Sequence, residues 1–259
     1  MIDLHSHVLP GLDDGAQDWE MALEMMVMAE EAGTEILVAT PHTHDMWHGG
    51  EPCSEVIPTL AHEATLRARR AGLSLQVLPG QECYIDDALP QQLNEGKWLT
   101  LGNSKTVLLE LGWSHWPPFI DKLVFDLQLA GYRILLAHPE RYRAVLDDPN
   151  LIVGLVERGV LTQVTSASIL GKFGESAQET ARALLEHNLA HVLSSDAHTT
   201  RGRNPKLSTA REQVADWFGE EFARKLVLDT PRALLNDEPI TLPEPRSIVR
   251  TRKKVFGIF

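Results

Sequence analysis

The sequence contains little cysteine, an excess of acidic over basic residues and no long apolar run. The two cysteines among 259 residues, Cys53 and Cys83, have neither the spacing of a zinc knuckle nor the number of a disulfide framework. No apolar stretch reaches the roughly 18 residues that cross a bilayer, and Met1 leads directly into the first apolar segment without a signal-like basic start. We therefore expect a soluble cytoplasmic protein without a transmembrane segment.

Positive charge is also scarce. Acidic residues outnumber Lys and Arg by 36 to 24, which gives a formal net charge of -12 at pH 7. Because binding to a phosphate backbone depends on Lys and Arg, we expect no nucleic-acid partner. Neither cysteine is followed by the Cys-x5-Arg loop of a thiol-based phosphatase, which argues against covalent cysteine catalysis.

Short apolar runs alternate with stretches of helical period along most of the chain. Seven runs predict strands, at 2–8, 35–42, 75–82, 106–112, 133–140, 161–168 and 191–198. The intervening stretches predict helices at 17–32, 54–71, 118–130, 147–158, 175–188 and 204–217. Such alternation is typical of parallel strands with right-handed crossovers. Seven units without an obvious reversal favour a distorted seven-stranded (β/α)7 barrel over an open doubly wound sheet.

One domain is expected over residues 1–236. The Pro-rich stretch 237–245 predicts an exit from it, and 246–259 carries five basic residues and no acidic one before an apolar end. We interpret the basic tail 246–259 as a solvated extension. The alternatives are contact of this tail with anionic lipid at the inner face of the membrane, with an acidic partner, or with a second protomer of a homo-oligomer.

Side chains that bind metals recur at or just after the ends of the predicted strands. They are His5, His7, Asp14, His42, Glu82, Glu110, His138, Asp196 and His198. Alternation along a strand places the two members of His-x-His and of Asp-x-His on one side, and the Gly/Asp-rich turn can return Asp14 over the barrel mouth. Buried imidazoles and carboxylates packed together need cations. Nitrogen and oxygen ligands without thiolates suit two or three ions of Mn, Fe, Zn or Mg.

Arg141 and Arg203 lie in loops that follow two of these strands. The planar guanidinium group matches phosphate oxygens, and a cluster of several metals supplies a hydroxide that attacks phosphorus at neutral pH. The combination predicts phosphoester hydrolysis with the two arginines holding the phosphate. Arg143 and Arg201 are weaker candidates, and neutralising an acid such as Glu140 is the alternative role.

Aromatic residues occur in loops on the expected catalytic side. Trp47 and Trp113 can line a site for a ring-bearing substrate, and we name both as candidate substrate-binding residues. Anchoring of the loops by hydrophobic contact is an equally open role.

Three residues close to candidate ligands in the sequence are expected to have other roles. His44 competes with His42, since the two form a second His-x-His pair. Cys83 follows Glu82 directly, so its thiol is expected to face away from the metals as a buried hydrophobe. Asp13 is expected to face solvent or to cap the turn.

The order of these motifs resembles the polymerase and histidinol phosphatase (PHP) superfamily, and within it the manganese-dependent bacterial protein-tyrosine phosphatases of capsule and exopolysaccharide loci. The resemblance runs from residue 1 to the region of residue 235, through MIDLHSHVLPGLDDG, ATPH, GQE, LLELG, AHPERY, TQV and SSDAH followed by RGR. It implies a distorted (β/α)7 barrel with a trinuclear metal centre, manganese favoured, held by the nine residues above with Glu82 as the bridging carboxylate. Arg141 and Arg203 match the substrate-binding arginines of that family.

The resemblance also implies a substrate. It is phosphotyrosine on a partner protein, typically the C-terminal tail of a membrane-associated bacterial tyrosine kinase that controls polysaccharide export. A phenolate with a pKa of about 10 leaves without a strong general acid.

Three alternatives stay open. Another PHP phosphoesterase would act on histidinol phosphate or a nucleotide phosphate. A metal-dependent amidohydrolase also begins with His-x-His, but such enzymes commonly use a barrel lysine that no strand end here offers. A non-catalytic binding module would be supported by erosion of the ligand set, and none is apparent.

Overall fold

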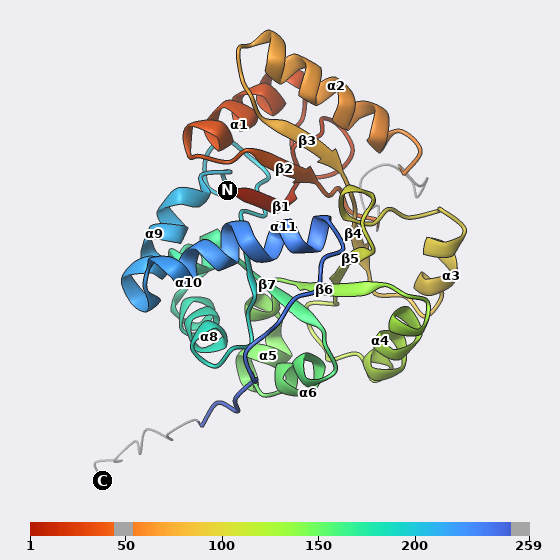
Figure 1. Cartoon of the computed structure of the whole chain (residues 1–259), viewed down its shortest axis with the longest axis vertical. Coiled ribbons are helices and arrows are strands. Elements are labelled where there is room, and N and C mark those ends of the chain that lie inside the picture. The colour runs from red at the N-terminus through yellow and green to blue at the C-terminus, as the bar shows by residue number, and fades with distance from the viewer. Residues whose placement is uncertain (44–53, 250–259) are drawn as a thin grey trace.

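The computed structural model describes residues 1–43 and 54–249, whose parallel strands form two sheets (Figure 1). The first sheet has the order β1-β2-β3, with β1 at Ile2–Ser6, β2 at Ile36–Ala39 and β3 at Gln76–Pro79. The second has the order β4-β5-β6-β7-β8, with β4 at Glu82–Tyr84, β5 at Thr106–Glu110, β6 at Arg133–Ala137, β7 at Leu161–Thr165 and β8 at Val192–Ser194.

Single residue pairs join the two sheets at two places. Ser6 at the end of β1 bridges Ala197 just beyond β8, and His42 beyond the central strand β2 bridges Glu82 at the start of β4, both in parallel orientation. The two sheets therefore form two joined arcs, called the ring below, with β3 at the outer edge of the first arc. This is the α/β arrangement of parallel strands that the alternating pattern predicted.

The predicted strand 75–82 is two strands, and the chain changes sheet between them. Gly80 lies at the break, where an added Cβ would be 3.0 Å from side-chain atoms of both Val38 and Leu101. The chain thus passes too close to its neighbours for most side chains. The predicted strands 161–168 and 191–198 also end early, at Thr165 and Ser194.

Helices cover the outer faces of the two arcs. Those on the first sheet are α1 (Trp19–Glu31) and α2 (Ile57–Arg70). Around the second lie α3 (Leu89–Asn94), α4 (Ile120–Leu129), α5 (Arg143–Asp147), α6 (Leu151–Glu157) and α8 (Glu175–Glu186). The short helix α7 (Ser166–Ile169) follows β7 directly and packs against α8. The chain continues through α9 (Leu207–Phe218), α10 (Glu220–Arg224), the π-helix η3 (Lys225–Asp229) and α11 (Thr230–Leu235). Two 3-10 turns complete the set, η1 (Leu101–Asn103) and η2 (Pro139–Arg141).

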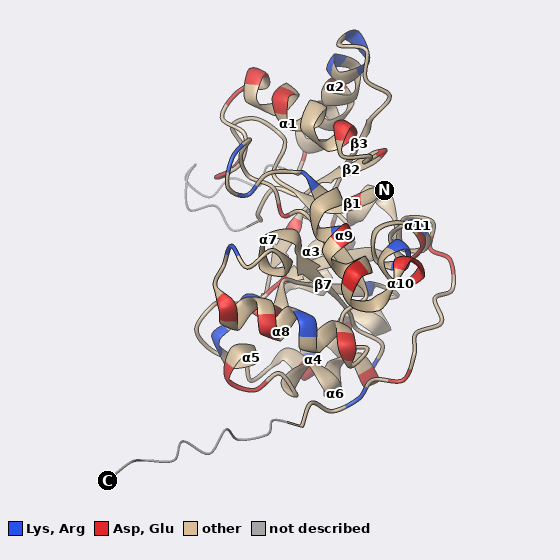
Figure 2. Cartoon of the chain, turned by 90° about the vertical axis from the view of Figure 1, so that its left-hand side faces the viewer, with Lys and Arg blue, Asp and Glu red and all other residues tan. Residues whose placement is uncertain are grey.

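The helix α1 illustrates how local sequence fixes these elements. The carboxylate of Asp18 accepts a hydrogen bond of 2.9 Å from the backbone N–H of Met21 and caps the first turn. Residues spaced by three and four positions, among them Met25 and Met26, are fully buried. In α8 the exposed positions carry both acidic and basic side chains, as Figure 2 shows. In the described part of the chain, no helix combines the length and apolar character that crossing a membrane requires.

One apolar cluster is shared by the two sheets. It includes Leu4 of β1, Leu108 of β5 and Leu135 of β6, together with Leu234 of α11. Helix α11 lies across both arcs in Figure 1, so it packs against the ring as a common cover. Burial of these side chains holds the two arcs together.

The segment 237–249 lies against the body of the protein. The backbone N–H of Arg246 donates to the carbonyl of His187 at the end of α8 (2.9 Å). Asn150 and Ile248 exchange two hydrogen bonds of 2.8 and 3.0 Å. The first residues of the predicted solvated tail 246–259 are therefore attached to the outer helices, and residues 250–259 lie outside the described residues.

Candidate metal centre

The structure brings all nine predicted ligands together at one side of the ring. Four overlapping groups have their potential ligand atoms within 4.8 Å of one another. They are His7, Asp14, His42 and His198; His5, His7 and Asp196; His5, Glu82 and His138; and His42, Glu82 and Glu110. Their shared members join the four groups into one continuous cluster of imidazoles and carboxylates.

His5 and His7 turn their Nε2 atoms toward each other. Their Nε2 atoms are 3.2 Å apart. Nδ1 of His5 lies 2.9 Å from Oε1 of Gln163, and Nδ1 of His7 lies 2.6 Å from Oδ2 of Asp13. Since both partners are acceptors, Nδ1 of each ring donates to them, and Nε2 is the nitrogen that each ring presents to the cluster. Burial would lower the pKa of both rings, but the neighbouring carboxylates outweigh it and raise that pKa, and a bound cation would take the place of the Nε2 protons.

Glu82 occupies the middle of the cluster. Its Oε1 lies 2.8 Å from Nε2 of His138, and its Oε2 lies 3.1 Å from Nε2 of His5 and 3.1 Å from Nδ1 of His42. Burial would raise the pKa of Glu82, but the nearby His5 and His42 outweigh it and hold that pKa well below its ordinary value. Its two oxygens face different histidines, which is the geometry a bridging carboxylate requires.

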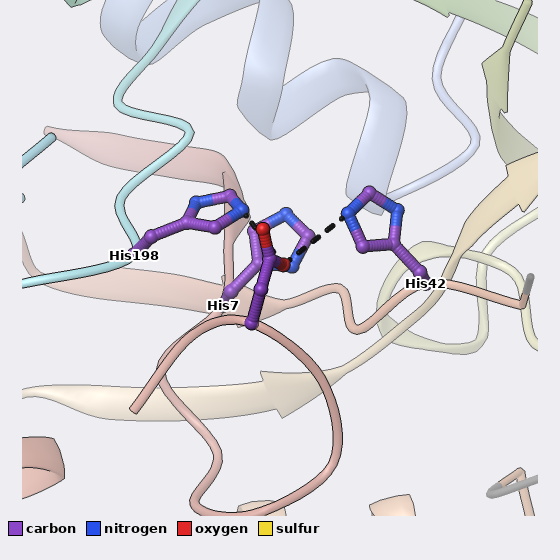
Figure 3. Close-up of side chains that lie close together, drawn as sticks. His7, His42 and His198 are labelled. Atoms are coloured by element: carbon purple, nitrogen blue, oxygen red, sulfur yellow. Dashed lines mark ion pairs between the residues drawn. The ribbon is translucent and has the colours of Figure 1, made fainter. Parts of the chain in front are cut away.

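Asp14 connects two further histidines above the cluster. In Figure 3 the rings of His7, His42 and His198 surround a carboxylate, and Oδ1 of Asp14 lies 3.2 Å from Nε2 of His198 and 3.6 Å from Nε2 of His42. Burial, with the charge of His7, lowers the pKa of His198 to about 4. His198 is therefore neutral near pH 7, the state in which imidazole binds a metal.

The backbone is in a left-handed conformation at two candidate ligands. The φ angles are 32° at His138 and 52° at Asp196. This conformation costs residues other than glycine on the order of 1–3 kcal/mol, and it clusters at functional sites. It also corrects the expectation for Asp196 and His198: β8 ends at Ser194, so the two side chains meet because the chain turns and not because they alternate on a strand.

Two residues of the centre were missed from the sequence. Asp13 is buried, and its Oδ2 holds Nδ1 of His7, so the expectation that it faces solvent is wrong. Its Oδ1 does cap the turn by accepting from the N–H of Gly15 (2.9 Å). Gln163 holds His5 from β7. Both residues lie in motifs that the sequence shows, Asp13 in GLDDG and Gln163 in TQV. Only the tertiary contacts show that they hold His7 and His5.

Arg141 and Arg203 both pair with Asp196. NH1 of Arg141 lies 2.7 Å from Oδ2 of Asp196, and NH2 of Arg203 lies 2.7 Å from Oδ1. Neither pairs with Glu140, whose buried carboxylate instead accepts from the N–H of Thr165 (2.8 Å). The two arginines therefore belong to the centre.

The weaker arginine candidates lie elsewhere. Arg143 pairs with Asp147 on α5 at 2.9 Å, and Arg201 is exposed.

Of the two candidate substrate-binding tryptophans, Trp113 lies in the described part of the chain. Trp113 stacks on His138, with ring centroids 5.1 Å apart and planes inclined by 13°, and Cζ of Arg141 lies 4.6 Å from its ring centroid. Trp47 and the competing ligand His44 lie outside the described residues. Cys83 is fully buried in the apolar cluster around the second sheet, which confirms its expected packing role.

Comparison with known proteins places this chain in a family. Residues 1–236 match the family described as "Capsular polysaccharide synthesis, CpsB/CapC". The chain belongs to this CpsB/CapC family. Tyrosine-protein phosphatase YwqE of Bacillus subtilis is 36% identical over 259 residues, with 100% of each chain covered. Tyrosine-protein phosphatase CpsB of Streptococcus pneumoniae is 28% identical, with 93% of this chain and 100% of that protein covered.

Solved structures confirm the family fold. A crystal structure described in a study of YwqE from B. subtilis and CpsB from S. pneumoniae, "unique metal-dependent tyrosine phosphatases", superimposes with a TM-score of 0.91 at 35% identity. It covers 96% of this chain and 100% of that chain. The lactonase Lmo2620 of Listeria monocytogenes shares only the fold, with a TM-score of 0.56 at 12% identity, covering 90% of this chain and 94% of that chain. The resemblance and the fold class that the sequence motifs suggested are thus confirmed.

Proposed function

We propose that this CpsB/CapC protein is a metal-dependent protein-tyrosine phosphatase. The observation that carries the proposal is the contact between Nε2 of His5 and Nε2 of His7 within a ring of carboxylates, next to two arginines. Such a buried array of imidazoles and carboxylates is suited to hold cations, and the arginines offer a place for an anion. Its relatives in the family are named tyrosine-protein phosphatases.

The donor set supports a centre of two or three divalent ions. In this proposal His5, His7, Asp14, His42, Glu82, Glu110, His138, Asp196 and His198 are the ligands, with Glu82 bridging. All donors are nitrogen or oxygen, which suits Mn, with Fe, Zn and Mg as alternatives, better than copper. Ions bound there would lower the pKa of a bound water and stabilise charge on phosphoryl oxygens.

The protein's own groups orient the reaction. Arg141 and Arg203 would bind phosphoryl oxygens through their planar N–H edges, next to the cluster to which Asp196 ties them. Asp13 and Gln163 keep the Nδ1 protons of His7 and His5 in place, so both rings present Nε2 to the centre. A phenolate leaving group needs no strong acid at its oxygen, so the chain need not supply one.

We propose in addition a protein substrate and a location. The substrate would be the phosphotyrosine-containing tail of a membrane-associated bacterial tyrosine kinase in capsule or exopolysaccharide synthesis. The support is the family match and the phosphatase names of its relatives. The protein would act in the cytoplasm, at times at the inner face of the membrane, with residues 1–236 as the catalytic domain and 237–259 as a C-terminal extension of it.

Turnover on matched substrates tests the function. Manganese-loaded protein is expected to hydrolyse a phosphotyrosine peptide faster than histidinol phosphate or a nucleotide phosphate. Arg141→Ala should reduce kcat/KM about 10²-fold or more, because charge stabilisation in the transition state would be lost. Arg143→Ala is the matched control, since its partner Asp147 lies outside the centre. Wild-type protein that stays inactive with Mn would refute the function, and preference for histidinol phosphate would favour the other phosphoesterase.

A further inference from the structure

Phe173 contacts both arginines of the centre, although its sequence position suggested no role. Its ring centroid lies 4.4 Å from Cζ of Arg141 and 6.0 Å from Cζ of Arg203. A guanidinium group within about 6 Å of a ring centroid is attracted by the negative face of the ring. One half-buried aromatic side chain therefore restrains two cations that come from different loops.

Arg141 contacts a second ring as well. Its Cζ lies 4.6 Å from the centroid of Trp113, which itself stacks on His138. NH1 of the same guanidinium group donates to Asp196. Two aromatic contacts and one ion pair together fix the position of Arg141 relative to the candidate metal ligands.

The turn that carries Phe173 is shaped by two glycines. Gly171 and Gly174 have φ angles of +71° and +93°, which other residues rarely adopt, and the N–H of Gly174 donates to the carbonyl of Gly171 (3.1 Å) to close the turn around Phe173. Nζ of Lys172 donates to the carbonyl of Gly202 at 3.2 Å. This hydrogen bond ties the turn to the loop that bears Arg203. The turn thus places the Phe173 ring and is itself fastened to the arginine loop.

We propose that Phe173 is a positioning residue that, together with Trp113, holds Arg141 and Arg203 in the geometry that binds phosphoryl oxygens. The proposal rests on the phosphatase function proposed above. A guanidinium group that lies on a ring keeps its N–H edge available for an anion, and restraint of its rotamers lowers the entropy lost on binding. Phe173 would therefore act on phosphate through the arginines.

Binding of inorganic phosphate isolates this role, because phosphate has no ring for Phe173 to contact. Calorimetry on the manganese-loaded full chain would compare wild type, Phe173→Leu and Phe173→Tyr. Phe173→Leu is expected to weaken phosphate binding about three- to thirty-fold, the range that loss of the ring contacts allows. Phe173→Tyr keeps the aromatic face and should restore wild-type binding. Phe125→Leu is the matched control, since Phe125 is 61% exposed on α4.

A double-mutant cycle tests whether the effect passes through Arg141. On an Arg141→Ala background, Phe173→Leu should change phosphate binding clearly less than it does on the wild-type background. Equal losses on both backgrounds would overturn the proposal, as would unchanged phosphate binding by Phe173→Leu. If Phe173→Leu raised KM for aryl phosphates and left the binding of inorganic phosphate unchanged, Phe173 would contact the substrate ring. The positioning role would again be refuted.

Thermal unfolding and metal content distinguish these outcomes from a folding defect. Phe173→Leu should keep both at wild-type values, and a variant that lost metal would show a structural role instead. Failure of the positioning role can also be distinguished from failure of the proposed function. Phosphate binding that depends on Phe173 in a protein without phosphotyrosine turnover would refute the function and leave the positioning role standing, whereas no phosphate binding by wild type would refute both.

Discussion

Oδ2 of Asp13 lies 2.6 Å from Nδ1 of His7 and keeps the opposite nitrogen of that ring free to bind a metal. Burial would raise the pKa of Asp13, but the charge of His7 and the hydrogen bond between them outweigh it and lower that pKa. A charged carboxylate behind an imidazole fixes its tautomer and makes it a stronger ligand. The contact is buried, so solvent screens it little.

Replacement of Asp13 should therefore weaken the metal centre. We expect Asp13→Ala to lower manganese affinity about 10- to 100-fold, the usual effect of removing a carboxylate behind a metal-binding histidine. Metal titration of the purified protein measures this change. Asp121→Asn serves as the control, because Asp121 is exposed on α4 and its ion pair is with Arg158 at the end of α6, outside the centre. Wild-type affinity in Asp13→Ala would show that His7 does not depend on this contact.

Removal of divalent ions should destabilise the fold. Imidazoles and carboxylates gathered around Glu82 would then face one another without cations. An ion at about 100 times its dissociation constant adds roughly 2.7 kcal/mol to the free energy of unfolding. We expect a chelator to lower Tm and added Mn to restore it. A Tm that is insensitive to both treatments would contradict a centre built into the fold.

Gly15 is expected to tolerate no side chain. A Cβ at this position would lie 2.1 Å from the backbone oxygen of His7, so the turn or β1 would have to move. Gly15→Ala should cost about 1–3 kcal/mol of the free energy of unfolding, as overpacking does, and should also lower metal affinity. Gly154→Ala is the matched control. A Cβ there meets nothing within 4 Å inside α6, so gain of helix propensity should stabilise the protein by about 0.5–1 kcal/mol.

These two substitutions are compared by denaturant unfolding. Equal effects of both alanines would mean that the close approach of Gly15 to His7 is not maintained in solution.

His191 should make stability depend on pH. Burial lowers its pKa from 6.5 to about 4, so it is neutral in the folded chain and accepts a hydrogen bond from the N–H of Thr162. Below pH 6.5 the unfolded chain binds a proton that the folded chain does not. The contribution of neutral His191 to the free energy of unfolding is therefore fully present above pH 6.5. It is lost between about pH 6.5 and 4, and the loss is up to roughly 3 kcal/mol.

The variant His191→Asn isolates this contribution. Its amide oxygen can accept from Thr162 but does not titrate, so unfolding between pH 4 and 7 should show a shallower slope than in wild type. Parallel slopes would mean that His191 is protonated to the same extent in the folded and unfolded chains.

Much of the centre could be read from the sequence because strand ends meet at one edge of a ring of parallel strands. His5, Glu110 and His138 each follow an apolar run, and the topology brings such positions together without further information. Contacts of residues inside loops could not be read in this way. Asp13 differs from Asp14 by one position in a turn, yet one is buried behind His7 and the other faces His42 and His198.

The backbone conformation at Asp196 could not be read from the sequence for a similar reason. The motif SSDAH reads as a continuous strand, but β8 ends at Ser194 and Asp196 is left-handed. Hydrogen bonds from distant parts of the chain hold this turn, including the one from the N–H of Asp196 to the carbonyl of His5 (2.9 Å).

The sequence by itself determined the alternation of parallel strands and helices, the family and the set of nine candidate ligands, because hydrophobic period and motif spacing are local properties of the chain. Only the tertiary structure decided that the ring is two arcs joined at Ser6 and His42, and that Phe173 lies against Arg141 and Arg203. Those relationships depend on packing between residues far apart in the chain, for which a single sequence carries no local signal.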